Sequence, residues 1–167
     1  MRAGIEAARS DLFEGARCLI TPTENSDPAA VQRVETFWQA LGCSTESMSP
    51  AIHDRKVARI SHLPHVAASA LVLAALSSDP SAMTCVANGF RDSTRIAAGD
   101  PELWTGILSD NRAEVLASLT DLSTRITELV EILSNSDEEA LRRFLAAAKS
   151  LRDQVPADPK TKKYGHH

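Results

Sequence analysis

The stretch that decides the fold is residues 49–76, SPAIHDRKVARISHLPHVAASALVLAAL. Ser49 followed by Pro50 is a typical helix start, because serine caps the first turn and proline fits its first position. An inner face is predicted at helical spacing, formed by Val57, Ile60, His65 (or Leu63) and Ala68. The helix is expected to run to about Leu76 and to kink at Pro64, which lacks a backbone N–H.

Upstream of this helix the pattern is that of an α/β layer. The short apolar run Arg17–Thr21 predicts a strand, and Ser44–Met48 predicts a second. Between them, a helix is expected to begin at Asp27 and Pro28 and to end near Gly42. Strand, helix and strand with short connections predict a βαβ unit with parallel strands. Two parallel strands make a poor domain, so this part of the chain is expected to be the end of a larger sheet.

Downstream, the sequence predicts helices to near the end of the chain. A short helix is expected over Ser81–Ala87, with Gly89 just beyond its end. Ser136, with Glu139 three residues later, predicts a capping box for the last helix, which runs from Asp137 to about Gln154.

The longest expected helix starts at Asp100 and Pro101 and runs to about residue 134. It would be roughly 50 Å long at 1.5 Å per residue. A small monomer has little to pack along such a length, so we expect a helical homodimer. The alternative is a break near Asp110 and Asn111, which would give two ordinary helices.

The predicted fold class is therefore mainly α. Residues 50–155 form an all-α domain, residues 1–49 are a βαβ remnant, and residues 156–167 are expected to be a flexible tail. The final Gly-His-His is typical of a truncated purification tag, so His166 and His167 are left out of the search for a site.

Composition limits the kinds of function. The chain has 167 residues, a net charge of −4 without a basic block, and 4% aromatic residues, so no nucleic-acid partner is expected. Its longest apolar segment, Val66–Leu76, is too short to span a bilayer, so no membrane partner is expected. Three widely spaced cysteines indicate buried thiols and a reducing, cytoplasmic location.

Two histidines form the first candidate for a binding site. His62 and His65 flank Pro64 and share a helix face, so the kink is expected to open a polar pocket beside them. Satisfied core histidines are the alternative. No metal site is expected, because His53 falls near the opposite side of the helix and no third ligand has convincing spacing.

The second candidate is NGFRDSTRIAAGDPELW, residues 88–104. Arg91 and Arg95 lie four residues apart, so on a helix both guanidinium groups would point one way and would suit carboxylates. A solvated turn is the alternative for these arginines and for Asp92, and Trp104 is more often core than ligand wall. Together the two candidates suggest an anionic, polar small molecule. No nucleophile arrangement or phosphate-binding loop is present, so no catalytic residue is assigned.

Three segments together resemble prephenate dehydrogenases and their arogenate-using relatives: DLFEGARCLITPT, HDRKVARISHLPHVAASAL and GFRDSTRIAAGDPELWTGILSDN. The resemblance runs from about Gly4 to about Leu151. It implies oxidative decarboxylation of prephenate to 4-hydroxyphenylpyruvate in tyrosine biosynthesis, with NAD or NADP taking the hydride. It also implies a nucleotide-binding Rossmann-type domain followed by a helical dimerisation domain, so residues 1–49 would be the last part of the former.

The resemblance further implies which residues contact the substrate, prephenate or arogenate. The expected substrate-binding residues are His65, Arg95, Arg91, His62, Asp92 and Trp104. His65 and Arg95 are the main contacts, whereas Arg91 stands where the family often has lysine. His53 matches a family histidine for which we expect a structural role. Tyrosine, as a feedback inhibitor, would occupy the same pocket.

The family's dinucleotide fingerprint and its catalytic histidine, in a His-Pro-x-Ala-Gly segment, lie upstream of the residues present. NAD or NADP is therefore expected to bind the full-length parent and not this chain alone. We predict that the isolated chain does not turn over prephenate. When prephenate and NAD or NADP are added to the purified chain, the absorbance of the reduced cofactor should therefore not rise. One alternative is a non-catalytic helical dimer that binds tyrosine or prephenate as a regulatory module. A plain oligomerisation domain is another.

Overall fold

The computed structural model describes residue 8 and residues 11–156, so the expectations for most of the tail, including His166 and His167, lie outside the described residues. The chain divides into two units. One combines residues 1–53 with residues 136–167, and the other consists of residues 54–135.

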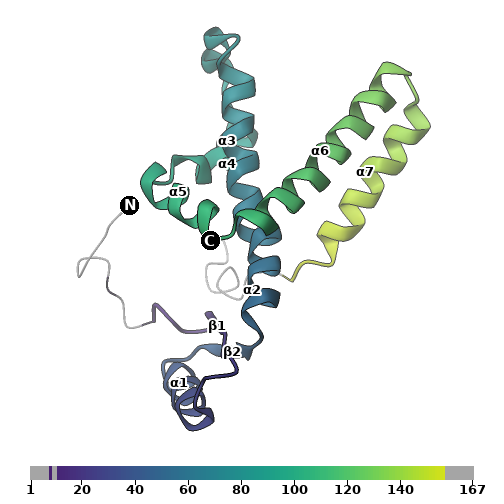
Figure 1. The fold of residues 1–167 in the computed structure, drawn as a ribbon. Helices are drawn as coiled ribbons and strands as arrows, with labels where there is room; N and C mark the ends of the chain where they lie inside the picture. Colours follow the sequence, from purple (N-terminus) through teal and green to yellow (C-terminus); the bar gives the residue numbers. More distant parts are fainter. Residues whose placement is uncertain (1–7, 9–10, 157–167) are drawn as a thin grey trace, which may run out of the picture. The chain divides into compact units, whose positions relative to one another are not determined.

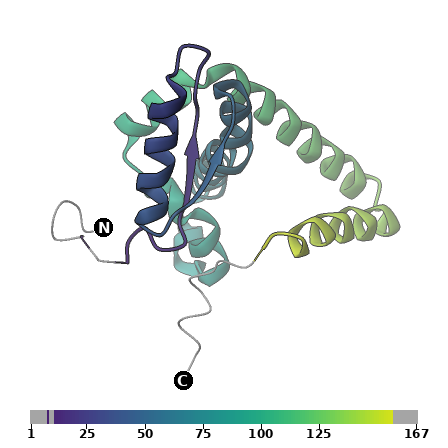
Figure 2. The same ribbon diagram turned by 90° about the horizontal axis from the view of Figure 1, so that it is seen from below.

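The first unit contains the expected βαβ arrangement: β1 (Arg17–Ile20), α1 (Pro28–Ala40) and β2 (Ser44–Ser47). The two strands are parallel with all four residues of each in register, and α1 lies along them, as Figure 2 shows. Asp27 caps α1 by accepting a hydrogen bond from the backbone N–H of Ala29. Gly42 has φ +88°, the left-handed conformation expected at the end of the helix. The local prediction for this part of the chain is confirmed.

Helix α7 (Glu138–Asp153) also belongs to the first unit, and its start differs from the prediction. The cap is Asp137, whose side chain accepts a hydrogen bond of 2.8 Å from the N–H of Ala140. Ser136 has φ +53°, in the left-handed region, which is outside the extended conformation of a typical N-cap. The predicted capping box from Ser136 to Glu139 is therefore wrong.

Residues 50–76 form one continuous helical rod, visible in Figure 1. It consists of α2 (Pro50–Val57), a π-helical turn η2 (Ala58–His62) and α3 (Leu63–Leu76). The N–H of Leu63 bonds to the carbonyl of Ala58, five residues back, just before Pro64. The disturbance expected at the proline is thus a π-turn immediately upstream of it, which lets the helix continue.

The buried face of this rod differs in part from the predicted one. The buried positions are Ala58, His62, His65 and Ala68. Ile60, which was expected on the inner face, is 74% exposed. The fully buried side chains of the rod are therefore small ones and imidazoles, whereas large aliphatic side chains such as Leu73 are exposed.

The rod Pro50–Leu76 has 27 residues and, by length and composition alone, is long and apolar enough to cross a membrane. The sequence analysis judged the length of this helix from the apolar segment Val66–Leu76 alone. It missed the full length, because the helix extends far upstream of that segment. A core helix of a soluble protein passes the same test. Two buried histidines, His62 and His65, lie in the middle of this helix.

Most of the rest of the second unit packs against this rod. Its elements are η3 (Pro80–Cys85), α4 (Asn88–Thr94), η4 (Arg95–Ala98), α5 (Pro101–Asp110) and α6 (Arg112–Ser134). The helix expected over Ser81–Ala87 is the short 3₁₀ helix η3, and Gly89 lies in the first turn of α4 instead of ending a helix. Asp100 caps α5 as predicted. The single long helix is wrong, because the chain breaks at Asn111, which was the alternative.

The three cysteines are free thiols. Cys43 is buried and Cys18 is half-buried, whereas Cys85 is exposed. The expectation of buried thiols is therefore wrong for Cys85.

Candidate functional site

The centre of the candidate site is a stacked pair of rings, His65 and Trp104. The ring centroids lie 3.5 Å apart and the planes are inclined by 11°. His65 comes from the first turn of α3 and Trp104 from the first turn of α5, so the packing of two helix starts creates the pair. The structure thereby brings together two residues that lie 39 positions apart in the sequence and that were both predicted to belong to the site.

The surroundings of His65 favour the neutral form of its imidazole. Its side chain is only 6% exposed, and burial lowers its pKa from the ordinary value of 6.5. Its Nδ1 atom is buried and has no hydrogen-bond partner among the described residues. A neutral ring keeps one nitrogen as an acceptor and the other as a donor, so His65 can form a hydrogen bond with a polar ligand without carrying a charge.

Gly99, between η4 and α5, allows the backbone to approach the stacked rings. A β-carbon at this position would lie 2.5 Å from Nε1 of Trp104 and 3.0 Å from Cε1 of His65. The sequence reasoning missed this residue. Its only signal was a glycine directly before the Asp100-Pro101 helix start, which is equally typical of an ordinary loop.

His62 lies on the same buried face and is 9% exposed. Its ring meets that of Trp104 edge-to-face at a centroid distance of 6.4 Å. Its Nδ1 atom lies 3.4 Å from Nδ2 of Asn111, and the same Nδ2 donates a 2.8 Å hydrogen bond to the backbone oxygen of Asp54. Asn111 was expected only as a possible helix break, so its place beside the histidines was also missed.

The charged residues of the second motif lie on elements that pack against α3. Arg91 and Asp92 are in α4, whereas Arg95 begins η4, so the two arginines do not share one regular helix as expected. All three side chains are exposed. Within the described part of the chain they form no ion pair, and they make no hydrogen bond to either histidine. The structure therefore places Arg95 on an element in contact with the helix of His65, but it does not join the charges to the stacked rings.

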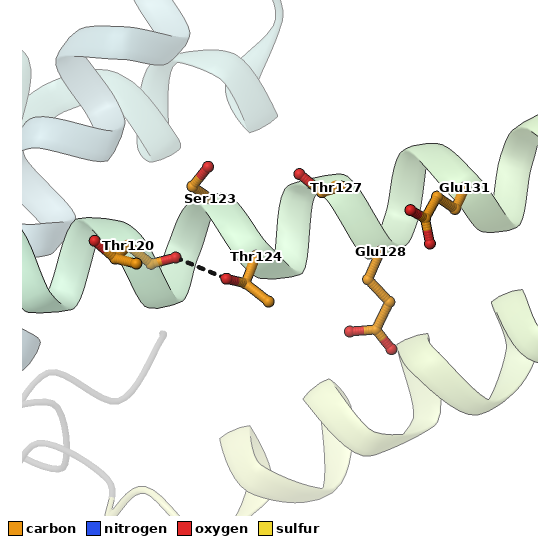
Figure 3. A pocket seen from close by; sticks show the side chains of 6 residues that line it. All are labelled: Thr120, Ser123, Thr124, Thr127, Glu128 and Glu131. Atoms are coloured by element: carbon orange, nitrogen blue, oxygen red, sulfur yellow. Dashed lines mark hydrogen bonds between the residues drawn. The ribbon is translucent and has the colours of Figure 1, made fainter.

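A hollow along α6, shown in Figure 3, does not belong to this site. Its lining residues are Thr120, Ser123, Thr124, Thr127, Glu128 and Glu131. The hydroxyl of Thr124 donates back to the carbonyl of Thr120 at 3.0 Å, as is common for threonine inside a helix. Since all of these residues come from one helix and are mostly exposed, they form a solvated face of α6.

The described residues do not fit the diphosphate of a dinucleotide. The connection after β1, Thr21–Ser26, contains no glycine, so it lacks the tight turn that lets a backbone approach a phosphate. The N-terminus of α1 is already occupied by the Asp27 carboxylate, which takes the N–H of Ala29 and would repel an anion. These residues therefore give no basis for placing a cofactor.

Comparison with known proteins identifies the relationship. The dimerization domain of the prephenate dehydrogenase family matches residues 49–147. The prephenate dehydrogenase of Bacillus subtilis (strain 168) is 33% identical over 158 residues, which are 93% of this chain and 43% of that protein.

Two solved structures extend the comparison to the fold. A prephenate dehydrogenase from Aquifex aeolicus, in complex with hydroxyphenyl propionate and NAD+, has a TM-score of 0.85 and 31% identity, covering 93% of this chain and 56% of that one. Arogenate dehydrogenase from Synechocystis has a TM-score of 0.80 and 33% identity, covering 90% of this chain and 56% of that one.

The chain thus spans about half the length of these relatives. The relatives are dehydrogenases and give no support to the regulatory-module alternative. The matched region contains both histidines, the arginine motif and Trp104, and the mainly helical fold is the one that the resemblance implied. The chain belongs to the prephenate dehydrogenase family and contains that family's dimerization domain.

Proposed function

We propose that this chain is the helical, substrate-binding part of a prephenate dehydrogenase-like enzyme of tyrosine biosynthesis. The complete enzyme would oxidatively decarboxylate prephenate, or its relative arogenate, and transfer a hydride to NAD or NADP. The observation that carries the proposal is the buried His65–Trp104 stack, which lies inside the matched region.

The chemistry of the residues suits such a substrate. Trp104 is half-buried and can give apolar contact to a six-membered carbon ring, and the neutral imidazole of His65 offers a hydrogen bond. Arg91 and Arg95 supply positive charge on elements packed against α3, and a guanidinium group binds a carboxylate through two parallel hydrogen bonds. His62 and Asp92 complete the set of proposed substrate-binding residues.

The same proposal covers assembly and catalysis. The exposed aliphatic side chains of the helical rod are proposed to form a homodimer interface, in keeping with the family's dimerization domain. No catalytic residue is assigned among the described residues, and the isolated chain remains predicted to be inactive. A cytoplasmic location and inhibition by tyrosine stay expectations.

Calorimetric titration of the purified chain tests the proposal. The ligands are prephenate, tyrosine and hydroxyphenyl propionate, the last being the compound bound to the Aquifex aeolicus relative. Replacing Arg95 by alanine removes a charge-assisted hydrogen bond, which is typically worth about 1.5–3 kcal/mol, so binding should weaken about tenfold or more. Arg125→Ala is the matched control, because Arg125 is an exposed arginine of α6 whose ion pair is with Glu128.

The outcomes separate the two parts of the proposal. Binding of prephenate or hydroxyphenyl propionate that is weakened by Arg95→Ala but not by Arg125→Ala supports both the site and the role of Arg95. Binding that both variants retain would remove Arg95 from the site. No binding by the unchanged chain would contradict the claim that these residues bind substrate by themselves.

A further inference from the structure

Asn111 stands at the break between α5 and α6, yet its side chain does not cap α6. An asparagine before a helix usually accepts a hydrogen bond from the first turn of that helix. Here the amide turns instead toward the long helical rod. Its Nδ2 atom donates to the backbone oxygen of Asp54 at 2.8 Å and lies 3.4 Å from Nδ1 of His62.

The Asp54 carbonyl determines which way the amide faces. A backbone oxygen only accepts hydrogen bonds, so the group that lies 2.8 Å from it has to be the NH₂ end of Asn111. The flipped amide would bring two acceptor oxygens to that distance, which is repulsive. The NH₂ end is therefore also the group that faces His62.

The tautomer of His62 follows from that orientation. An NH₂ group has two hydrogens and no lone pair to offer, so a nitrogen beside it has to be the acceptor. Nδ1 of His62 then carries the lone pair, and the proton of the neutral ring is on Nε2. We propose that Asn111 is a positioning residue that sets His62 in the neutral tautomer protonated on Nε2.

This tautomer limits what His62 can do in a binding site. If the substrate site proposed above is right, on which this step rests, any hydrogen bond between Nε2 of His62 and a ligand has His62 as the donor. Its partner then has to be an acceptor, such as a carboxylate or keto oxygen, and not a hydroxyl hydrogen. The proposed tautomer therefore favours ligands that place an acceptor oxygen beside Nε2 of His62.

Nitrogen-15 NMR of the imidazole rings tests the tautomer directly, without any ligand. Long-range correlations between ring protons and nitrogens distinguish a protonated from an unprotonated nitrogen, and His62→Gln identifies the His62 signals. In the unchanged chain we expect Nδ1 to be unprotonated and Nε2 to be protonated. A carboxylate can only accept, so Asn111→Asp should move the proton to Nδ1.

Asn135→Asp is the matched control, because Asn135 also stands at an end of α6 but is exposed. It should leave the His62 spectrum unchanged. A protonated Nδ1 in the unchanged chain would overturn the proposal, and so would an Asn111→Asp protein that folds but keeps the original tautomer. The spectrum of the unchanged chain decides the matter even if Asn111→Asp fails to fold.

The ligand titrations separate this inference from the proposed function. Failure of every ligand to bind would count against the substrate site but would leave the tautomer measurement intact. Conversely, the wrong tautomer with normal ligand binding would remove Asn111 as a positioning residue and keep the site. If both proposals hold, Asn111→Asp should weaken binding of hydroxyphenyl propionate about tenfold or more, because His62 loses its donor toward the ligand.

Discussion

At the scale of single residues, the stacked pair of His65 and Trp104 depends on the absence of a side chain at Gly99. Gly99→Ala would place a methyl group 2.5 Å from Nε1 of Trp104, so the indole or the loop has to move. Such overpacking typically costs about 1–3 kcal/mol. We expect urea unfolding to show a loss of that size.

Gly106→Ala provides the control for that substitution. Gly106 lies within α5, and a β-carbon there would meet no atom within 4 Å. Alanine in a helix is more favourable than glycine by about 0.5–1 kcal/mol, so this variant should be as stable as the unchanged chain or more so. Equal stability of both glycine variants would contradict the close packing described at Gly99.

The pH dependence of stability should reveal the burial of His65. Because burial lowers its pKa in the folded chain, the unfolded chain binds the proton more readily as the pH falls below 6.5. The contribution of neutral His65 to the free energy of unfolding is fully present above that pH. It is lost as the pH falls toward the lowered pKa of the folded chain. Urea unfolding at several pH values should therefore show a smaller loss on acidification for His65→Gln than for the unchanged chain, and parallel profiles would refute the assignment.

Sequence reasoning found some of these residues and missed others for a physical reason. His62 and His65 were predicted to share a face because a spacing of three residues fixes that relation within any helix. Gly99 and Asn111 were missed as site residues because their importance comes from tertiary contacts, Gly99 with Trp104 and His65, and Asn111 with Asp54 and His62. Helical periodicity carries no information about those neighbours.

At the scale of elements, helix starts were predictable where two signals agreed. Asp27 and Asp100 are each followed by proline, and both cap a helix as expected. At the start of α7, the sequence predicted Ser136 as the cap and Asp137 as the first helical residue, and this assignment was wrong. The conformation of the connection decided the matter, because Ser136 takes the left-handed turn and leaves Asp137 to cap.

Removal of this cap gives a test at the level of the element. Asp137→Ala should lower the free energy of unfolding by about 0.5–2 kcal/mol, because the N–H of Ala140 loses its acceptor. Ser136→Gly should not destabilise the chain, since glycine adopts the positive φ of this position without strain. Thermal unfolding of the two variants would show the reverse order if Ser136 were the cap.

The connection between α5 and α6 shows the limit of element prediction. Apolar residues recur on both sides of the break at helical spacing, so the pattern favoured one long helix. The break occurs at Asn111, whose side chain bonds to Asp54 and His62. This helix end therefore coincides with a tertiary contact, and no proline or glycine in the sequence marks it.

At the scale of the whole molecule, large apolar side chains were a poor guide to the interior of a single chain. The inner face of the long rod is lined by alanine and histidine, whereas Ile60 and Leu73 are 74% and 65% exposed. A helix that is apolar on nearly all sides is typically covered on all sides. A second copy of the chain is the cover that the family's dimerization domain suggests.

Multi-angle light scattering can test directly whether a second copy of the chain packs on the rod, because it measures the oligomeric state. We expect the unchanged chain to be a dimer and Leu73→Glu to be largely monomeric, because the substitution buries a charge in the proposed interface. Ala29→Glu is the control, since it adds the same charge to the exposed first turn of α1, outside residues 49–147. A monomeric unchanged chain, or a Leu73→Glu protein that remains a dimer, would argue against an interface on this rod.

The stacked pair also gives the protein a built-in optical probe. The sequence has two tryptophans, and they fall in different units: Trp38 lies against Phe13 and Phe37 in the first, and Trp104 lies against His65 in the second. In Trp38→Phe protein, all tryptophan emission would come from the ring beside His65. Ligand entry, acidification and melting of the second unit could then each be followed by fluorescence, with no attached dye.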